Sequence, residues 1–179
     1  AEAFRIQKDY YRRYGTTMRG MMTEHGVSPD DFLAYVHDID HSPLEPNPAM
    51  GQALAKLPGR KLILTNASVA HAEKVLERLA LGVTFDGVFD IISAEFEPKP
   101  ARQTYRRFLD LHEVDAERAA MFEDLARNLA IPHEFGMTTV LVVPDGTQKV
   151  VREAWEMEGR DAPHVDHVTE DLTGFLAQL

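Results

Sequence analysis

The chain contains 179 residues, 44% of them hydrophobic, and carries a formal net charge of −10 at pH 7. This length and apolar content suffice for one domain, or for a core with a small accessory domain, and argue against a disordered chain. The acidic balance argues against nucleic acid or an anionic membrane as a partner, because both bind cationic surfaces. A small anionic ligand is still possible, and the lack of cysteine excludes disulfides and suits a cytoplasmic protein. No apolar run is long enough to cross a bilayer.

The first forty or so residues are expected to be helical throughout. Apolar residues recur there at helical spacing, first in a tyrosine-rich and then in a methionine-rich segment. A third helix is expected over residues 32–37, since Ser28 can cap it and Pro29 suits its first turn. The aromatic and methionine side chains could stack on a nucleobase, but we favour a place in the core. They are Tyr10, Tyr11, Tyr14, Met18, Met21 and Met22.

A proline-rich stretch at residues 43–48 is the expected domain boundary. It separates a helical cap domain over residues 1–45 from a core over residues 46–179. Strand and helix patterns alternate in the core, which is typical of an α/β fold with a parallel sheet and helices on both faces. Such sheets bind ligands beyond the carboxyl ends of their strands. The expected strands are 61–65, 88–92, 119–122, 138–143 and 165–168, and the expected helices follow Ser68, surround residues 105–109, and span 125–135 and 171–179.

Two of the expected strand ends carry groups that suit phosphate. Thr65 and Asn66 follow the first strand, where a hydroxyl and backbone N–H groups can bind phosphoryl oxygens, although such a pair is more often a turn and helix cap. Lys99 stands between Pro98 and Pro100, which restrict the backbone on both sides. Its ammonium can neutralise an anionic nucleophile and a transferring phosphoryl group, and the alternative is a solvated surface lysine.

The third strand end favours a metal ion. Glu123 and Asp124 follow an apolar strand, and Asn128 adds an amide oxygen four residues later. Hard oxygen ligands around one turn suit Mg²⁺, which takes one or two carboxylates and keeps some waters. The alternative is that the two carboxylates favour the positive end of the next helix. We prefer the Mg²⁺ site, because the three strand ends share one predicted sheet.

The order of these three segments, with Gly136 and Met137 following, resembles the second, third and fourth motifs of the haloacid dehalogenase (HAD) superfamily. The likeness is closest to the pyrimidine 5′-nucleotidase-like branch, and it includes residues 14–17, 35–40 and 122–129. It implies a HAD-like Rossmannoid sheet with a cap, and a Mg²⁺-dependent phosphomonoester hydrolase acting on a small phosphorylated metabolite through an aspartyl-phosphate. Under this resemblance Thr65, Asn66 and Lys99 bind phosphate, Thr65 and Lys99 serve catalysis, and Asp124, Glu123 and Asn128 lie at the metal. Asn128 stands where many relatives have a second aspartate.

The first motif of that family, a strand carrying Asp-x-Asp, has no match before Lys61. The only Asp-x-Asp, at residues 38–40, ends a helical segment and is interpreted as part of the cap. In the family the missing strand lies between the strands that end at Thr65 and Asp124. Without it, buried backbone groups would stay unpaired at about 1–3 kcal/mol each. We therefore expect an Asp-x-Asp segment upstream of Ala1.

Two other functions and one other metal site are weighed. If the chain truly starts at Ala1, it is a catalytically inactive HAD module that binds a ligand or partner, because turnover needs a nucleophile. A dehalogenase is a further option, but those relatives need no metal and the Glu123–Asp124 pair argues for one. His37 and His41 have the spacing of metal ligands on a helix, although polar residues at a helix end are usually only solvated.

Overall fold

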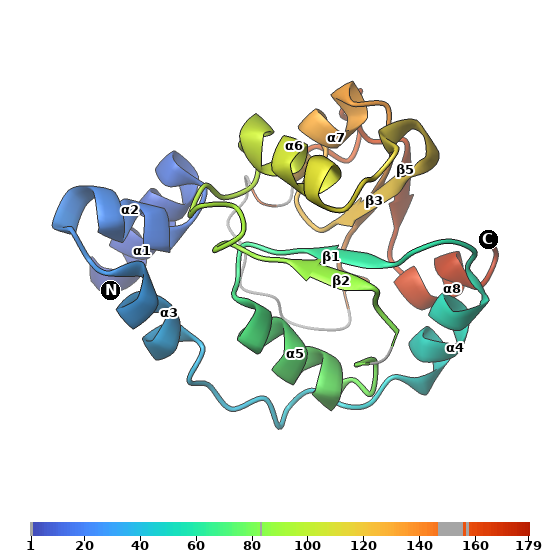
Figure 1. The fold of residues 1–179 in the computed structure, drawn as a ribbon, viewed down its shortest axis with the longest axis horizontal. Coiled ribbons are helices and arrows are strands. Elements are labelled where there is room, and N and C mark those ends of the chain that lie inside the picture. The colour runs from blue at the N-terminus through green and yellow to red at the C-terminus, as the bar shows by residue number, and fades with distance from the viewer. Residues whose placement is uncertain (1, 83, 147–155, 157) are drawn as a thin grey trace. The chain divides into compact units, whose positions relative to one another are not determined.

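The computed structural model describes residues 2–82, 84–146, 156 and 158–179 (Figure 1). The chain divides into two compact units, Ala1–Lys99 and Pro100–Leu179. This division differs from the predicted boundary between a cap over residues 1–45 and a core over residues 46–179, which stays a prediction.

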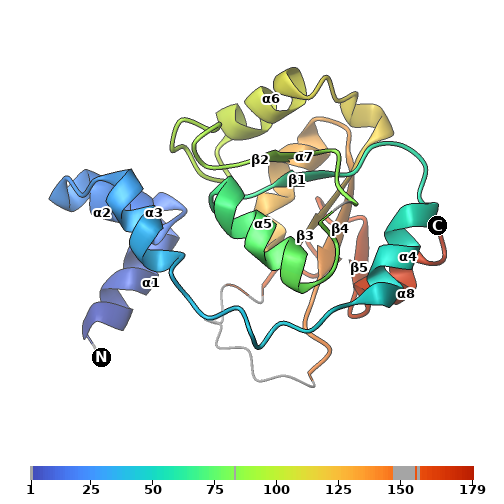
Figure 2. The same cartoon turned by 60° about the horizontal axis from the view of Figure 1, so that its bottom comes forward.

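The first unit begins with three helices, which confirms the helical prediction for this segment (Figures 1 and 2). They are α1 (Glu2–Tyr14), α2 (Thr17–His25) and α3 (Pro29–Val36). Ser28 caps α3 as expected, because its side chain accepts a hydrogen bond from Asp31 N, and Pro29 occupies the first turn. Of the predicted core tyrosines and methionines, Met18 is buried and the others are half-buried.

The rest of the first unit contains one parallel strand pair and two helices. The elements are α4 (Pro48–Lys56), β1 (Leu62–Leu64), α5 (Val69–Arg78) and β2 (Gly87–Phe89), and Ile63 lies opposite Val88. Ser68 caps α5 by accepting a hydrogen bond from His71 N, which confirms its predicted place. The sequence analysis predicted no helix at α4, although Asn47 caps it and Pro48 occupies its first turn.

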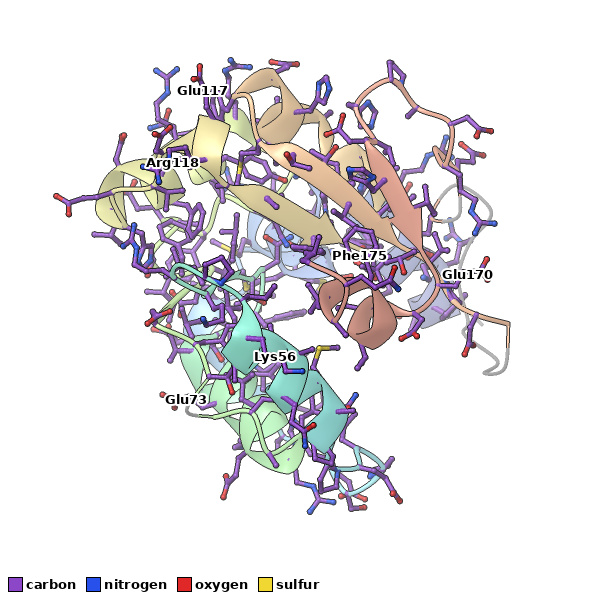
Figure 3. All side chains as sticks on the ribbon, turned by 90° about the vertical axis from the view of Figure 1, so that its right-hand side faces the viewer. Lys56, Glu73, Glu117, Arg118, Glu170 and Phe175 are labelled. Carbon is purple, nitrogen blue, oxygen red and sulfur yellow. The ribbon has the colours of Figure 1, made fainter. Side chains whose placement is uncertain are left out.

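The second unit contains the three-stranded parallel sheet β3–β4–β5, whose strands lie side by side in both ribbon views (Figures 1 and 2). Its elements are α6 (Arg102–Leu111), the 3-10 turn η1 (Ala116–Arg118), β3 (Ala120–Glu123), β4 (Thr138–Val142), β5 (His167–Thr169) and α8 (Leu172–Leu176). Phe175 of α8, labelled in Figure 3, packs edge-on against Phe122 of β3. Tyr105, Leu129 and Val140 are buried in this unit's core.

The helix predicted over residues 125–135 is wrong as one element. The chain forms the 3-10 turn η2 (Ala126–Asn128) and then the short helix α7 (Ala130–Glu134). Pro132 has no N–H to give to the Asn128 carbonyl, and Tyr105 Oη donates to that carbonyl instead, at 2.6 Å. The missing N–H of Pro132 therefore interrupts the helix, and the Tyr105 hydroxyl satisfies the carbonyl that is left unpaired.

The last predicted strand and helix are shifted. The strand β5 begins at His167 rather than at residue 165, because the Asp166 carboxylate accepts hydrogen bonds from Thr139 N and Thr139 Oγ1. The helix α8 is shorter than the predicted 171–179, and Asp171 is its N-cap.

The α/β class with parallel strands is confirmed, but the described strands form two sheets, β1–β2 and β3–β4–β5. Across the described ranges, β1 and β3 each pair along a single edge, and all three residues of β1 are only half-buried. None of the helices in these ranges has the length and apolar character needed to cross a membrane.

Candidate phosphate site and acidic turn

The end of β1 presents a hydroxyl on a turn. Thr65 N donates to Phe89 O at 2.9 Å, which extends the β1–β2 pairing by one bond. Thr65 Oγ1 accepts from Ala67 N at 3.0 Å, so the side chain is held against the turn and its O–H hydrogen can still donate to an anion. The turn leads directly into α5, whose first turn follows Ser68.

The structure brings Lys99 to the same place, although it lies 33 residues beyond Asn66. Asn66 Oδ1 accepts from Lys99 N at 2.8 Å, and Asn66 Nδ2 donates to Lys99 O at 3.3 Å. Lys99 Nζ donates to Leu64 O, the last carbonyl of β1, at 3.0 Å. An ammonium, a hydroxyl and an amide therefore gather at the carboxyl end of one strand, as the sequence predicted for a phosphate site.

Asp90 also belongs to this strand end, and the sequence analysis missed it. It follows β2, is 4% exposed, and its two carboxylate oxygens accept from Val69 N and Ser93 N. It thereby ties the start of α5 to the end of β2. The signal that could have found it is a carboxylate directly after an apolar strand, the same signal that drew attention to Asp124.

The second unit holds the three predicted metal ligands around one turn after β3. The Glu123 carboxylate is 7% exposed and accepts hydrogen bonds from Asp124 N, Leu125 N and Asn128 Nδ2, at 2.7, 3.2 and 2.9 Å. The hydrogen bonds of Glu123, including the one to Asn128, therefore stabilise the turn itself. Asp124 is exposed at its apex.

The donor set of this turn suits a hard cation. Asn128 Oδ1 is buried and has no hydrogen-bond partner in the part of the chain that the structure describes, and Asp124 offers an exposed carboxylate. Burial, and secondarily the Glu123 charge, raises the pKa of Tyr105 far above its usual value, so its hydroxyl keeps its proton and donates to Asn128 O. Oxygen ligands of this kind are those that Mg²⁺ takes from proteins.

The two histidines with metal-ligand spacing contact a third histidine. The His37 ring stacks on the His71 ring with centroids 4.3 Å apart, and His41 Nε2 lies 3.5 Å from His71 Nδ1. Ser68 Oγ lies 3.0 Å from His37 Nδ1. Burial, then the neighbouring imidazoles and Lys74, lower the pKa of His37 and His71. Over the described ranges, no group of three or more His, Cys, Asp or Glu side chains is arranged to hold a metal ion.

A family comparison identifies the fold. The family model for haloacid dehalogenase-like hydrolases matches residues 8–136, which is most of the chain. The chain belongs to the haloacid dehalogenase-like hydrolase family. The matched range includes β1, β2 and β3 and the strand-end residues from Thr65 to Asn128.

Solved structures show the same fold at low identity. The L-2-haloacid dehalogenase from Xanthobacter autotrophicus with chloropropionic acid covalently bound is similar over 91% of this chain and 74% of that chain, with 18% identity and a TM-score of 0.61. A haloacid dehalogenase-like protein of unknown function from Agrobacterium tumefaciens is similar over 97% of this chain and 88% of that chain, with 14% identity and a TM-score of 0.53. The Unknown transcript 4 protein from Saccharomyces cerevisiae is similar over 75% of this chain and 67% of that chain, with 20% identity and a TM-score of 0.51.

Proposed function

We propose that this HAD-like hydrolase is a Mg²⁺-dependent phosphatase for small phosphomonoesters, of the pyrimidine nucleoside 5′-monophosphate class, in the cytoplasm. The observation that carries the proposal is the strand end where Lys99 and Thr65 lie beside Asn66. There the Lys99 ammonium is anchored on Leu64 O and its backbone on Asn66, so a phosphoryl group can bind without ordering the lysine first. The cation lowers the energy of a transition state in which negative charge spreads over the phosphoryl oxygens.

The acidic turn after β3 supports the choice of a phosphatase over a dehalogenase. Asp124 is the residue that we assign to hold Mg²⁺, because its carboxylate is exposed while the Glu123 carboxylate accepts three hydrogen bonds from its own turn. Asn128 Oδ1 is a second oxygen near this turn. Bound Mg²⁺ would neutralise phosphoryl oxygens and polarise the phosphorus for attack. A carbon–halogen bond offers no phosphoryl oxygens for a bound cation to neutralise.

The nucleophile of this proposal is an aspartate upstream of Ala1. Within the described residues β1 and β3 each pair along one edge, and this supports the proposal, since a further strand can pair only where an edge is open. The carboxylate of that aspartate would attack phosphorus and release the alcohol, and water would then hydrolyse the aspartyl-phosphate to phosphate.

The test uses the complete protein with its upstream segment. Purified protein is screened for phosphate release from nucleoside 5′-monophosphates and other small phosphomonoesters, with Mg²⁺ and with EDTA. Lys99→Ala and Asp124→Ala are each expected to lower kcat/KM by a factor on the order of 100 to 1000. Lys56→Ala is the matched control, since Lys56 is exposed on α4 (Figure 3) and should leave activity unchanged.

Two other outcomes would replace the proposal. Chloride release from 2-chloropropionate without metal, and no phosphate release, would make the chain a dehalogenase. Binding of phosphate or a nucleotide by calorimetry, with no turnover of any ester, would favour the inactive binding module. Activity of Lys99→Ala close to that of the wild type would end the assignment of this strand end.

A further inference from the structure

The segment before Lys99 has an unusual backbone. Glu95 and Phe96 have φ values of 53° and 60°, and both carry side chains that disfavour this left-handed conformation. The turn is closed by hydrogen bonds from Glu95 N to Ile92 O and from Phe96 N to Ile91 O, each 2.8 Å long. Backbone held in this region persists where surrounding contacts fix it, and such places are often functional sites.

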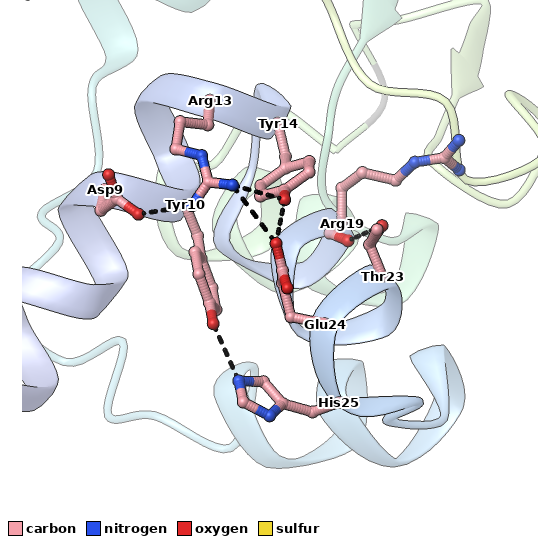
Figure 4. Close-up of polar contacts among 8 residues, drawn as sticks. All are labelled: Asp9, Tyr10, Arg13, Tyr14, Arg19, Thr23, Glu24 and His25. Carbon is pink, nitrogen blue, oxygen red and sulfur yellow. Dashed lines mark hydrogen bonds and ion pairs between the residues drawn. The ribbon is translucent and has the colours of Figure 1, made fainter.

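A side chain of the helical segment supplies one of those contacts. Arg19 lies in the first turn of α2, where its N–H donates to the Thr16 hydroxyl at 3.1 Å. Its guanidinium Nη1 donates to Phe96 O at 3.2 Å. Figure 4 shows the Arg19 guanidinium directed away from the cluster in which Arg13 pairs with Glu24. The Arg19 side chain therefore contacts the turn before Lys99 and not the cluster that joins α1 and α2.

The loop between α1 and α2 also touches the Lys99 backbone. Gly15 has a φ of 83°, and a Cβ at this position would lie 3.1 Å from Pro98 Cγ and 3.2 Å from Lys99 O. Only glycine allows both this conformation and this close approach. The Lys99 carbonyl thus lies between the Gly15 backbone and the Asn66 amide, which donates to it at 3.3 Å.

We propose that Arg19 is a positioning residue that holds the turn at residues 95–96 and, with the Gly15 loop, fixes Lys99 for binding the transferring group. Arg19 acts through Lys99 and does not itself touch the reacting phosphoryl group. The link runs from α2 through Phe96 and residues 97–98 to Lys99. It couples the N-terminal helices α1–α3 to the carboxyl end of β1. This inference rests on the proposed phosphatase function for its effect on rate, but the structural link can be measured without any substrate.

The test compares Arg19→Met with Arg12→Met in the complete protein. Arg12 is an exposed arginine of α1 and controls for the loss of one positive charge and one long side chain. Arg19→Met is expected to lower kcat/KM by about tenfold to a hundredfold, since a misplacement of about 1 Å has effects of this size. Arg12→Met should match the wild type, and Arg19→Lys should recover part of the loss, because its single ammonium can still donate to Phe96 O.

A double variant separates positioning from a general loss of structure. If Arg19 acts through Lys99, Arg19→Met should cause no further loss in a Lys99→Ala background, measured with an activated aryl phosphate. Multiplicative losses in the double variant would overturn the proposal. Gly15→Ala should lower kcat/KM as Arg19→Met does, because the methyl group displaces Pro98 and Lys99.

Hydrogen exchange distinguishes failure of this inference from failure of the proposed function. Amide exchange over residues 94–99 should become faster in Arg19→Met and not in Arg12→Met, while exchange in α6 stays unchanged. If the wild type hydrolyses no phosphate ester but exchange responds this way, the phosphatase fails and the link holds. Unchanged exchange, or equal kcat/KM for Arg19→Met and Arg12→Met, would overturn the positioning role.

Discussion

The Asn66 side chain binds both polar groups of the Lys99 backbone. Its Oδ1 accepts from Lys99 N at 2.8 Å and its Nδ2 donates to Lys99 O at 3.3 Å, so one amide fixes the lysine in two directions. A side-chain amide offers an acceptor and a donor side by side without a charge. The backbone of Lys99, which lies after β2, is therefore held by a residue that follows β1.

Replacing this amide should impair function more than folding. Asn66→Ala is expected to lower kcat/KM for phosphate release by about tenfold to a hundredfold, since Lys99 loses its two anchoring bonds. Asn66→Asp keeps the acceptor, loses the donor and places a carboxylate oxygen against Lys99 O, so its loss should be at least as large. Asn47→Ala serves as control, because it removes an asparagine that caps α4 and should lower stability alone. Wild-type rates in Asn66→Ala would contradict this role.

The Glu123–Asn128 pair can be tested by exchange of its two groups. Asn128→Asp would place a second carboxylate 2.9 Å from Glu123 Oε1, inside the turn. We expect it to lower the free energy of unfolding by about 3–5 kcal/mol, because a buried charge then lacks a partner. The double variant Glu123→Gln with Asn128→Asp restores a donor and an acceptor in swapped places. Urea unfolding should show that it is more stable than Asn128→Asp alone.

A conservative change tests the contact that satisfies the Asn128 carbonyl, where the predicted helix over residues 125–135 is interrupted. Tyr105→Phe removes the hydroxyl that donates to Asn128 O at 2.6 Å and leaves that carbonyl without this bond. The expected loss of unfolding free energy is about 1–3 kcal/mol. Tyr35→Phe is the control, since Tyr35 is 84% exposed and its hydroxyl can bind water. Equal stability of the two variants would show that the hydroxyl is not important for the turn.

The three-histidine cluster should make stability depend on pH. The pKa of His37 and of His71 is lowered in the folded state, so the unfolded chain binds protons more readily. Stability is therefore complete well above the ordinary histidine pKa of about 6.5 and falls as pH drops through it, until the folded-state groups are protonated too. Thermal unfolding between about pH 8 and pH 5 measures this loss.

A histidine outside the cluster provides the comparison for that measurement. His71→Gln should flatten the pH dependence, because it removes one lowered pKa and the ring that stacks on His37. His167→Gln should preserve the slope, since His167 is an exposed residue of β5. A slope unchanged by His71→Gln would show that other groups cause the acid sensitivity.

Local sequence signals were sufficient for much of the fold. The caps Ser28 and Ser68 each accept a bond from an N–H three residues away, so short-range geometry alone determines where α3 and α5 begin. The apolar runs before Thr65 and Glu123 likewise predicted β1 and β3 within a residue or two. The hydroxyl, ammonium and carboxylates at strand ends were also readable, because parallel strands present their carboxyl ends to one side.

Only the tertiary structure decided the contacts between residues far apart in the chain. Asn66 and Lys99 are 33 residues apart, and Arg19 and Phe96 are 77 residues apart. No pattern in the amino-acid sequence predicts that their polar groups form hydrogen bonds. The hydrogen bond from Tyr105 to the Asn128 carbonyl likewise joins two groups that are 23 residues apart in the chain. Local propensity acts within a few neighbouring residues, whereas each of these bonds, worth about 1 kcal/mol, joins groups that only the folded chain brings together.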